Sequence, residues 1–240
     1  MSKEIIKFHC IVWPAILMSA RYELPRKIFA HGWLTINGQK MSKSLGNMLS
    51  PEIFVEKYGV DALRYYYARE IPFGQDGDFS EESLKNRLNN ELANELGNLL
   101  SRTLTLVEKN LDSEIKKDKT DKNLFKNLKI KKIDKFMESL EIHNAIAGIF
   151  GFIQDCNKYI NDNKPWEIED KEKLNKILYN IVDGLRIISI LIYPFMPETS
   201  GKIIKQIGQK SNELNVMKLD DCVPGKLDSV KVKKGDILFK

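Results

Sequence analysis

The sequence predicts a mostly α-helical protein in which a short α/β segment comes first and a helix bundle follows. The first observation is that apolar residues recur at helical spacing over residues 80–109, 122–161 and 170–208. The second is that strand-like patterns nearly vanish after residue 80, whereas "KIFAHGWLTI" before it is rich in β-branched and aromatic side chains. The third is a hydrophobic content of 42%, which is enough for a folded core and excludes a disordered chain.

A helix and then a strand are expected at the start of the chain. Six residues recur at helical spacing and predict an amphipathic helix that breaks down before Pro25: Ile5, Phe8, His9, Val12, Ile16 and Leu17. Residues 27–36 follow as a predicted strand, which runs into Asn37-Gly38. That dipeptide favours a two-residue hairpin turn because both central residues must take positive φ. The strand and turn therefore present the segment that comes after them.

The remainder of the first 79 residues is predicted to form two short helices and a loop. The helices are "EIFVEKYG" and "DALRYYYARE", with Gly59 as the break between them. Residues 72–80, "PFGQDGDFS", are expected to be a loop because of their Pro, Gly and Asp content. The chain of 240 residues exceeds the usual size of one domain, so we expect two, residues 1–79 and residues 80–240.

Two segments beside the predicted long helices have a different character. Residues 114–132 are rich in lysine and are expected to form a solvated connection, with a nucleic-acid-binding arm as the alternative. The tail, residues 222–240, contains Pro, Gly and short alternating runs. We expect the tail to be an extended segment that lies over the body of the protein.

Charge and cysteine content limit the class of protein. The net charge is +5 and the sequence pI is about 8.9, a mild basic bias that is compatible with nucleic-acid binding without identifying it. Cys10, Cys156 and Cys222 lie far apart and include no C-x-x-C pair, so neither a disulfide framework nor a zinc site is expected. The most apolar run, residues 181–195, is interrupted by charge and too short to span a bilayer. We therefore expect a cytoplasmic protein with no membrane partner and no protein-bound metal.

The segment "NGQKMSKSLGN", residues 37–47, has the composition of a phosphate-binding loop. Two lysines stand three residues apart, and flanking glycines leave the backbone free to move. The ammonium groups of Lys40 and Lys43 can close over a polyphosphate as movable point charges, while Ser42 and Ser44 add hydroxyl donors. The alternative is an exposed lysine loop without a function.

The five residues "KMSKS" resemble the second signature of class I aminoacyl-tRNA synthetases, and their surroundings resemble methionyl-tRNA synthetase in particular. The resemblance is carried in order by "FHCIVWPA", "FAHGWLTINGQKMSKSLGN", "YGVDALRYYYAREIPFGQDGDFS", "NELGNLLSRT" and "NKPWEIEDK", so it covers nearly the whole chain. It implies the C-terminal part of a Rossmann-type class I catalytic domain, which is α/β and incomplete here, followed by an anticodon-binding α-helix bundle.

The resemblance implies that the lysine loop binds ATP and acts in catalysis. In the family this loop stabilises the transition state in which the amino-acid carboxylate attacks the α-phosphate and pyrophosphate leaves. Lys43 takes the larger share and Lys40 assists, with Met41, Ser42 and Ser44 completing the ATP-binding loop. His31 is expected near the nucleotide, and a packed strand histidine is the alternative. ATP enters with Mg²⁺ as the substrate.

A second set of residues resembles the methionine pocket of the family. Ile5, Phe8, His9 and Trp13 fall on one face of the predicted N-terminal helix. The resemblance implies that their aromatic and aliphatic walls hold the thioether side chain and that His9 adds a polar contact. The alternative is that the same face is part of a packed core.

A third set resembles the anticodon-reading residues. Polar side chains stand four residues apart along the predicted long helix: Asn90, Asn94, Asn98 and Arg102. The match of "GNLLSR" to the family implies that Asn98 and Arg102 contact base edges, where an amide and a guanidinium can each form paired hydrogen bonds. Trp166 in "NKPW" matches the aromatic residue on which a base stacks. The alternatives are a solvated helix face and a tryptophan that caps the bundle.

The first signature of the class, of His-Ile-Gly-His type, does not occur around the three histidines of the chain, His9, His31 and His143. We therefore expect the C-terminal half of a methionyl-tRNA synthetase, as a natural subunit or as a truncated product, that is inactive alone. Its expected partners are tRNA(Met), ATP, methionine and a complementary chain with the N-terminal half. The alternatives are a stand-alone tRNA-binding module and half of another class I synthetase.

Overall fold

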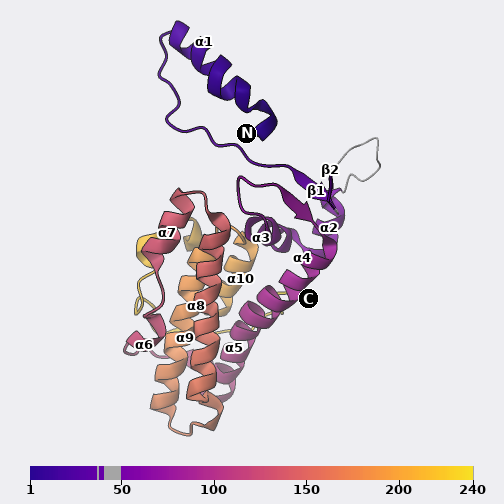
Figure 1. The fold of residues 1–240 in the computed structure, drawn as a ribbon. Coiled ribbons are helices and arrows are strands. Elements are labelled where there is room, and N and C mark those ends of the chain that lie inside the picture. Colours follow the sequence, from indigo (N-terminus) through magenta and orange to yellow (C-terminus); the bar gives the residue numbers. More distant parts are fainter. Residues whose placement is uncertain (37, 41–49, 240) are drawn as a thin grey trace.

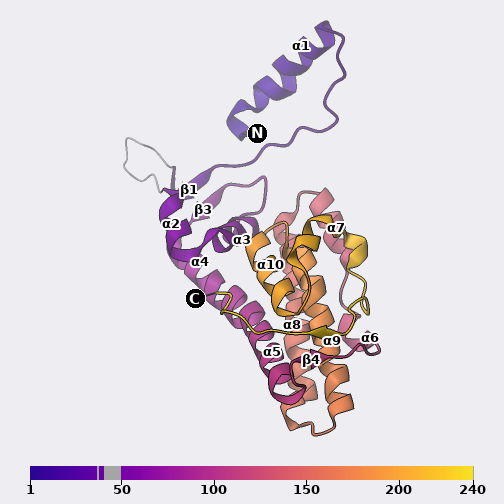
Figure 2. The same cartoon turned by 180° about the vertical axis from the view of Figure 1, so that it is seen from behind.

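The computed structural model describes residues 1–36, 38–40 and 50–239, and Figures 1 and 2 show it from two opposite sides. Most of the described chain is helical, which confirms the predicted fold class. A helix bundle forms the larger body, and a small sheet with two helices lies at one end of it. The N-terminal helix lies apart from both (Figure 1).

The N-terminal helical run, residues 3–19, confirms the predicted amphipathic helix. It consists of η1 (Lys3–Ile5), η2 (Phe8–Val12) and α1 (Trp13–Ser19) in continuous succession. Every residue of the run is exposed or half-buried. An extended segment connects the run to the sheet (Figure 1), and two backbone hydrogen bonds between residues 1–3 and His31 fasten its first turn.

The small sheet has the strand order β2-β1-β3. Strands β1 (Leu34–Ile36) and β2 (Gln39–Lys40) are antiparallel with Ile36 opposite Gln39, so two residues connect them and the predicted hairpin is confirmed. Gly38 has a φ of 74°, as this turn requires. Strand β3 (Gly77–Phe79) runs parallel to β1 on its other side.

Two secondary-structure predictions in this region were wrong. The strand expected at 27–36 is limited to residues 34–36, because only these three residues pair with β3. The loop expected at 72–80 contains β3, whose Pro-, Gly- and Asp-rich surroundings conceal it. Gly77 fits there because a Cβ atom at this position would lie 2.4 Å from the Ile71 side chain.

Two helices cover this sheet, as predicted. They are α2 (Pro51–Tyr58) and α3 (Val60–Glu70), and Gly59 separates them with a φ of 84°. A small apolar core joins both helices to the sheet and to the start of the next helix: Phe54, Leu63, Tyr66, Phe79 and Leu84.

One long helix leads from the sheet into the bundle. It comprises α4 (Glu81–Arg87), the π-helical segment η4 (Leu88–Gly97) and α5 (Asn98–Asn110), which confirms the helix expected from residue 80. The Ser80 hydroxyl caps its start by accepting a hydrogen bond from the Ser83 amide at 3.3 Å. The helix buries one stripe of leucines in the bundle: Leu88, Leu92, Leu96, Leu99, Leu100 and Leu104.

The remaining bundle helices are shorter than predicted, because turns interrupt the two long helical patterns. They are α6 (Lys122–Phe125), α7 (Ile130–Glu138), α8 (Ile142–Asn163), η5 (Pro165–Glu167), α9 (Lys171–Ile192) and α10 (Pro197–Gln206). Leu140, with a φ of 62°, separates α7 from α8. Pro197 starts α10, where proline fits because the first turn has no intrahelical donor to lose. Across the described residues, no helix combines the length and apolarity that crossing a bilayer requires.

The tail lies over the bundle, as predicted. After η6 (Ser211–Val216) and η7 (Leu219–Asp221), strand β5 (Val230–Lys231) pairs with β4 (Glu114–Ile115). Leu227 and Val232 of the tail are buried. The linker is not the fully solvated connection that we expected, because it buries Ile115 in β4 and two side chains of α6.

Candidate functional site

A polar groove lies between the long helix and α8. It has a volume of about 480 Å³ and is lined by side chains of the two helices: Asn94, Glu95, Asn98, Arg102, Gln154, Asn157, Lys158, Asn161 and Asp162. We call it the α5–α8 groove. Leucines anchor the long helix in the core on the side away from the groove, so Asn98 and Arg102 face outward one turn apart.

Of the three residues expected to read an anticodon, Asn98 and Arg102 line this groove, and Trp166 lies beside Arg102. The guanidinium of Arg102 donates to the Asn161 carboxamide oxygen at 2.9 Å, and its central carbon lies 5.8 Å from the centroid of the Trp166 ring. Trp166 is 51% exposed, whereas Pro165 beside it is buried and holds the turn in place. A half-exposed indole next to a guanidinium presents a flat surface for stacking and donors for base edges.

None of the groove residues on α8 was singled out from the sequence, and Glu95 on the long helix was missed as well. Glu95 Oε1 accepts from Gln154 Nε2 at 2.8 Å, and Asn157 Nδ2 donates to the Glu95 carbonyl at 3.2 Å. Burial raises the pKa of Glu95, and the Glu91 carboxylate adds to this effect. The available signal was that Gln154, Asn157 and Asn161 are polar residues spaced three and four apart within an apolar helix.

A charged network ties the groove helix to the sheet region. Tyr65 on α3 donates to Glu91, which also pairs with Arg87, and Arg87 pairs with Glu70 at 2.8 Å. Burial and the hydrogen bond to Glu91 raise the pKa of Tyr65, so its hydroxyl remains a donor. Arg69 completes the network at 3.6 Å from Glu91. The network links the long helix to α3, which packs against the sheet.

The lysine loop itself lies largely outside the described residues. Met41, Ser42, Lys43 and Ser44 all fall there, and of Lys40 the structure gives the backbone position in β2. The support of the loop is described: Asp78 accepts hydrogen bonds from the Thr35 hydroxyl at 2.7 Å and the Gly38 amide at 2.9 Å. These two bonds lower the pKa of Asp78. The sheet therefore holds the hairpin that presents the loop.

The residues expected to bind methionine share one face of the N-terminal helical run. His9 Nδ1 lies 3.0 Å from the Ile5 carbonyl, and its ring meets Trp13 edge-on at 6.0 Å. Phe8 is 59% exposed and Trp13 is 42% exposed, so the alternative of a packed core within this chain is wrong. His31 is exposed too and pairs with Ser2 in an isolated bridge outside the strands, which contradicts a packed strand histidine.

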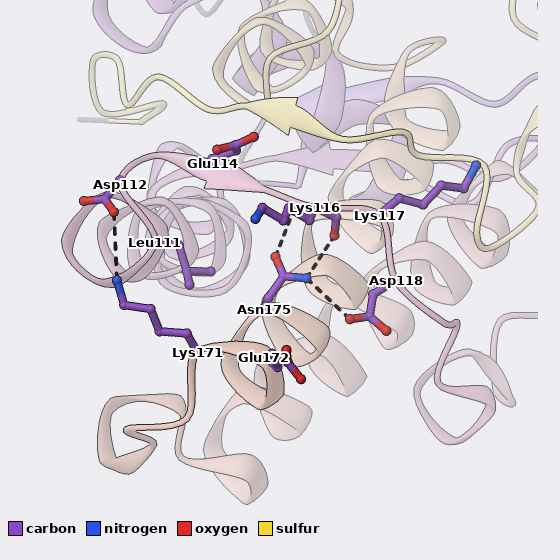
Figure 3. Close-up of a pocket in the computed structure, with 9 residues that line it drawn as sticks. All are labelled: Leu111, Asp112, Glu114, Lys116, Lys117, Asp118, Lys171, Glu172 and Asn175. Atoms are coloured by element: carbon purple, nitrogen blue, oxygen red, sulfur yellow. Dashed lines mark hydrogen bonds and ion pairs between the residues drawn. The ribbon is translucent and has the colours of Figure 1, made fainter.

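Another hollow, of about 450 Å³, lies where the end of α5 approaches the start of α9 (Figure 3). Four acidic side chains balance its three lysines: Asp112, Glu114, Asp118 and Glu172 against Lys116, Lys117 and Lys171. Asn175 holds the linker there by bonding both backbone groups of Lys116 at 3.0 Å. Because the opposite charges nearly cancel, the hollow does not attract a polyanion. We interpret the hollow as part of the structural contact between the linker and α9.

The part of the chain that the structure describes contains no group of three His, Cys, Asp or Glu side chains placed to hold a metal ion. Cys156 and Cys222 are buried, and burial raises the pKa of both thiols, to about 11 for Cys222. A protonated, buried thiol is a poor metal ligand. The expectation of no protein-bound metal stays a prediction.

Comparison with known families agrees with the division of the fold. Residues 1–104 match the family described as tRNA synthetases class I (M), and residues 125–222 match the anticodon-binding domain of tRNA ligase. The first match includes the sheet and the start of α5, and the second includes α7 to α10. The chain is therefore related to the class I tRNA synthetases.

The particular relatives are methionine–tRNA ligases. The enzyme of Caldanaerobacter subterraneus subsp. tengcongensis is 42% identical over all of this chain and 39% of its own length, and that of Thermotoga maritima is 43% identical over 86% of this chain and 34% of its own. The crystal structure of Mycobacterium tuberculosis methionyl-tRNA synthetase bound by methionyl-adenylate superimposes with a TM-score of 0.90 at 36% identity, over 100% of this chain and 49% of that one. The chain thus spans about two fifths of the length of these curated relatives.

Proposed function

We propose that the chain is the C-terminal half of a methionine–tRNA ligase. It would take part in ATP-dependent activation of methionine and in transfer to tRNA(Met), and would supply the lysine loop and anticodon recognition. The proposed division of labour follows the two predicted domains, with catalysis in residues 1–79 and anticodon binding in residues 80–240. The relatives are enzymes of this kind, and the M. tuberculosis structure holds methionyl-adenylate, the product of the activation step.

In the proposed activation step the methionine carboxylate attacks the α-phosphorus of ATP, and pyrophosphate leaves with the bond electrons. Negative charge grows on the leaving pyrophosphate, so cations that approach it during the reaction lower the barrier. We assign this role to Lys43, assisted by Lys40, with Met41, Ser42, Ser44 and His31 near the nucleotide. ATP would bring Mg²⁺ with it as part of the substrate.

We further propose that the N-terminal helical run is completed by another polypeptide that carries the N-terminal half of the synthetase. The run exposes apolar side chains that a stable surface rarely exposes together: Ile5, Ile6, Phe8, Ile11, Val12, Trp13, Ile16 and Met18. Methionine would bind where Ile5, Phe8, His9 and Trp13 meet that partner. The chain alone would then be inactive, and we expect it to act in the cytoplasm.

The observation that carries the proposal is that Asn98 and Arg102 line one groove while the Trp166 ring lies beside Arg102. These residues come from α5 and from the turn after α8, more than 60 positions apart, yet the Arg102 guanidinium lies over the Trp166 ring. An indole suits base stacking, and a guanidinium beside an amide suits reading of base edges. A solvated helix face does not require this convergence.

The test is a binding titration of the chain against stem-loop RNAs that differ only in the anticodon. CAU should bind more tightly than changed anticodons, because edge contacts carry sequence information that phosphate contacts do not. Arg102→Ala should reduce that difference. Equal affinities for all anticodons, with a steep salt dependence, would indicate a general basic surface and contradict the proposal.

A further inference from the structure

The floor of the α5–α8 groove holds two acceptor oxygens without donors. Glu95 Oε2 and Asn157 Oδ1 are buried from solvent, and neither has a hydrogen-bond partner among the residues described. Their companion atoms are engaged, since Glu95 Oε1 accepts from Gln154 and Asn157 Nδ2 donates to the Glu95 carbonyl. Buried acceptors without donors are uncommon and cost stability, so such a pair in a groove calls for a ligand that donates.

The charges around Glu95 leave its carboxylate incompletely compensated. Glu91 lies one turn before it on the same helix and disfavours its charge, whereas Arg69 and the Gln154 amide favour the charge. The nearest guanidinium in the groove, that of Arg102, donates to Asn161 instead. The missing partner is therefore a group that can donate two hydrogens, placed in the groove that Asn98 and Arg102 also line.

We propose that Glu95 and Asn157 bind the exocyclic amino group of a cytosine or adenine base that enters this groove. Such an amino group carries two hydrogens, one for each oxygen. Uracil and guanine present a carbonyl oxygen at the corresponding ring position, and that oxygen would face two acceptors. The inference rests on the proposed function, because the methionine anticodon, CAU, offers one cytosine and one adenine.

Entry of the base requires one side chain to move. Both oxygens are inaccessible in this structure, and the exposed Gln154 is the residue that donates to the Glu95 carboxylate. The outer part of Gln154 moves aside while its amide keeps the hydrogen bond to Glu95 Oε1, and the amino group of the base then reaches Glu95 Oε2 and Asn157 Oδ1. Glu95 and Asn157 are thereby specificity-determining, since a base without an amino group at this position leaves both oxygens unpaired.

The test is a double-mutant cycle between Glu95 and each amino group. The chain is titrated with a stem-loop RNA carrying CAU and with two RNAs in which 2-pyrimidinone replaces cytosine or purine replaces adenine, changes that delete the amino group alone. One deletion should weaken binding to the unchanged chain about tenfold, as expected for a hydrogen bond to a charged group. In Glu95→Gln, that penalty should fall below about twofold, because Gln154 keeps the carboxamide oxygen and the new NH₂ faces the groove.

Glu172→Gln is the matched control, because it makes the same change at an exposed residue outside the groove. It should leave the tenfold penalty unchanged, and thermal unfolding should verify that Glu95→Gln folds like the parent chain. If Glu95→Gln changes the affinity for all three RNAs equally, or for none, the inference is wrong while anticodon recognition stands. If the unchanged chain does not distinguish anticodons, the proposed function itself is contradicted.

Discussion

The N-terminal helical run and α9 have similar apolar patterns and opposite surroundings. In α9 every residue from 178 to 192 is buried, whereas residues 3–19 are all exposed or half-buried. Phe8, Ile11 and Ile16 are each about 60% exposed. An apolar face predicts that a helix packs against something, but the pattern does not say whether the partner surface lies in the same chain.

This difference separates a region whose apolar face is buried in the same chain from one whose apolar face is not. The bundle forms one continuous core whose residues run from Ala62 to Val232 along the chain. The N-terminal run contributes nothing to that core, although burial of one large apolar side chain is worth about 1.5–3 kcal/mol. We therefore expect anticodon recognition to survive in the isolated chain and methionine activation to require the complementary polypeptide.

The largest expected effect is the recovery of activation. The chain alone should show no methionine-dependent exchange of pyrophosphate into ATP, and addition of a polypeptide with the N-terminal half of a methionine–tRNA ligase should raise exchange by about a thousandfold or more, because enzymes accelerate such reactions by at least that factor. Exchange is measured with labelled pyrophosphate. Robust exchange by the isolated chain would remove the distinction between the two regions.

Truncation of one apolar side chain in the bundle and one in the N-terminal run compares how much each region contributes to the free energy of unfolding. Leu96→Ala removes a side chain with no exposed surface and should lower the free energy of unfolding by about 2–5 kcal/mol. Ile11→Ala is the control, and it should change stability by less than about 0.5 kcal/mol because Ile11 is 61% exposed. Urea unfolding followed by circular dichroism measures both. Similar losses for the two variants would contradict the comparison.

Removal of the Trp166 ring should weaken RNA binding and leave methionine activation nearly unchanged. Trp166→Ala should weaken RNA binding by about 1–3 kcal/mol, since its exposed ring is expected to stack on a base. Pyrophosphate exchange by the reconstituted enzyme should be nearly unchanged, because Trp166 belongs to the bundle and not to the sheet region. A parallel loss of both activities would mean that the tryptophan acts through folding.

The smallest effect concerns the junction of α2 with the long helix. Hydrogen bonds from Lys57 at 2.6 Å and from Tyr58 lower the pKa of Glu81 to about 2. Because the pKa in the folded state lies below the ordinary value, this contact contributes fully above about pH 4.5 and is lost as the pH falls toward 2.

An NMR titration of the Glu81 carboxyl carbon measures this midpoint. Lys57→Ala should move it upward, toward the ordinary glutamate value. Lys85→Ala should move it less, because Lys85 lies 3.4 Å away and acts by charge alone. Equal midpoints in the parent chain and in Lys57→Ala would contradict the assigned cause.

Local patterns predicted the elements that depend on neighbours in sequence. The helix that begins near residue 80 and the Asn37-Gly38 connection were both evident, because each involves residues within a few positions of one another. Strand β3 was missed because its partner, β1, lies about 40 residues earlier and its own composition resembles a loop. The break at Leu140 carries no Gly or Pro signal.

The residues of the candidate site also differ in whether local sequence patterns could predict them. Asn98 and Arg102 are one helical turn apart, so the sequence placed them together, and the resemblance supplied Trp166. Glu95 and Asn157 come from different helices, and their shared lack of donors arises only from tertiary packing. A polar residue in a helical stripe is usually a solvated one, so the spacing of Gln154, Asn157 and Asn161 was only a weak signal.

Hydrogen exchange of the intact chain, alone and with the complementary polypeptide, tests most directly whether the N-terminal run and α9 differ in protection. In the chain alone, amides of residues 3–19 should exchange orders of magnitude faster than those of residues 178–192, because no core protects the N-terminal run. Addition of the complementary polypeptide should slow residues 3–19 and leave residues 178–192 unchanged. If residues 3–19 are already as protected as α9 in the isolated chain, or if they do not respond to that polypeptide, the account is wrong.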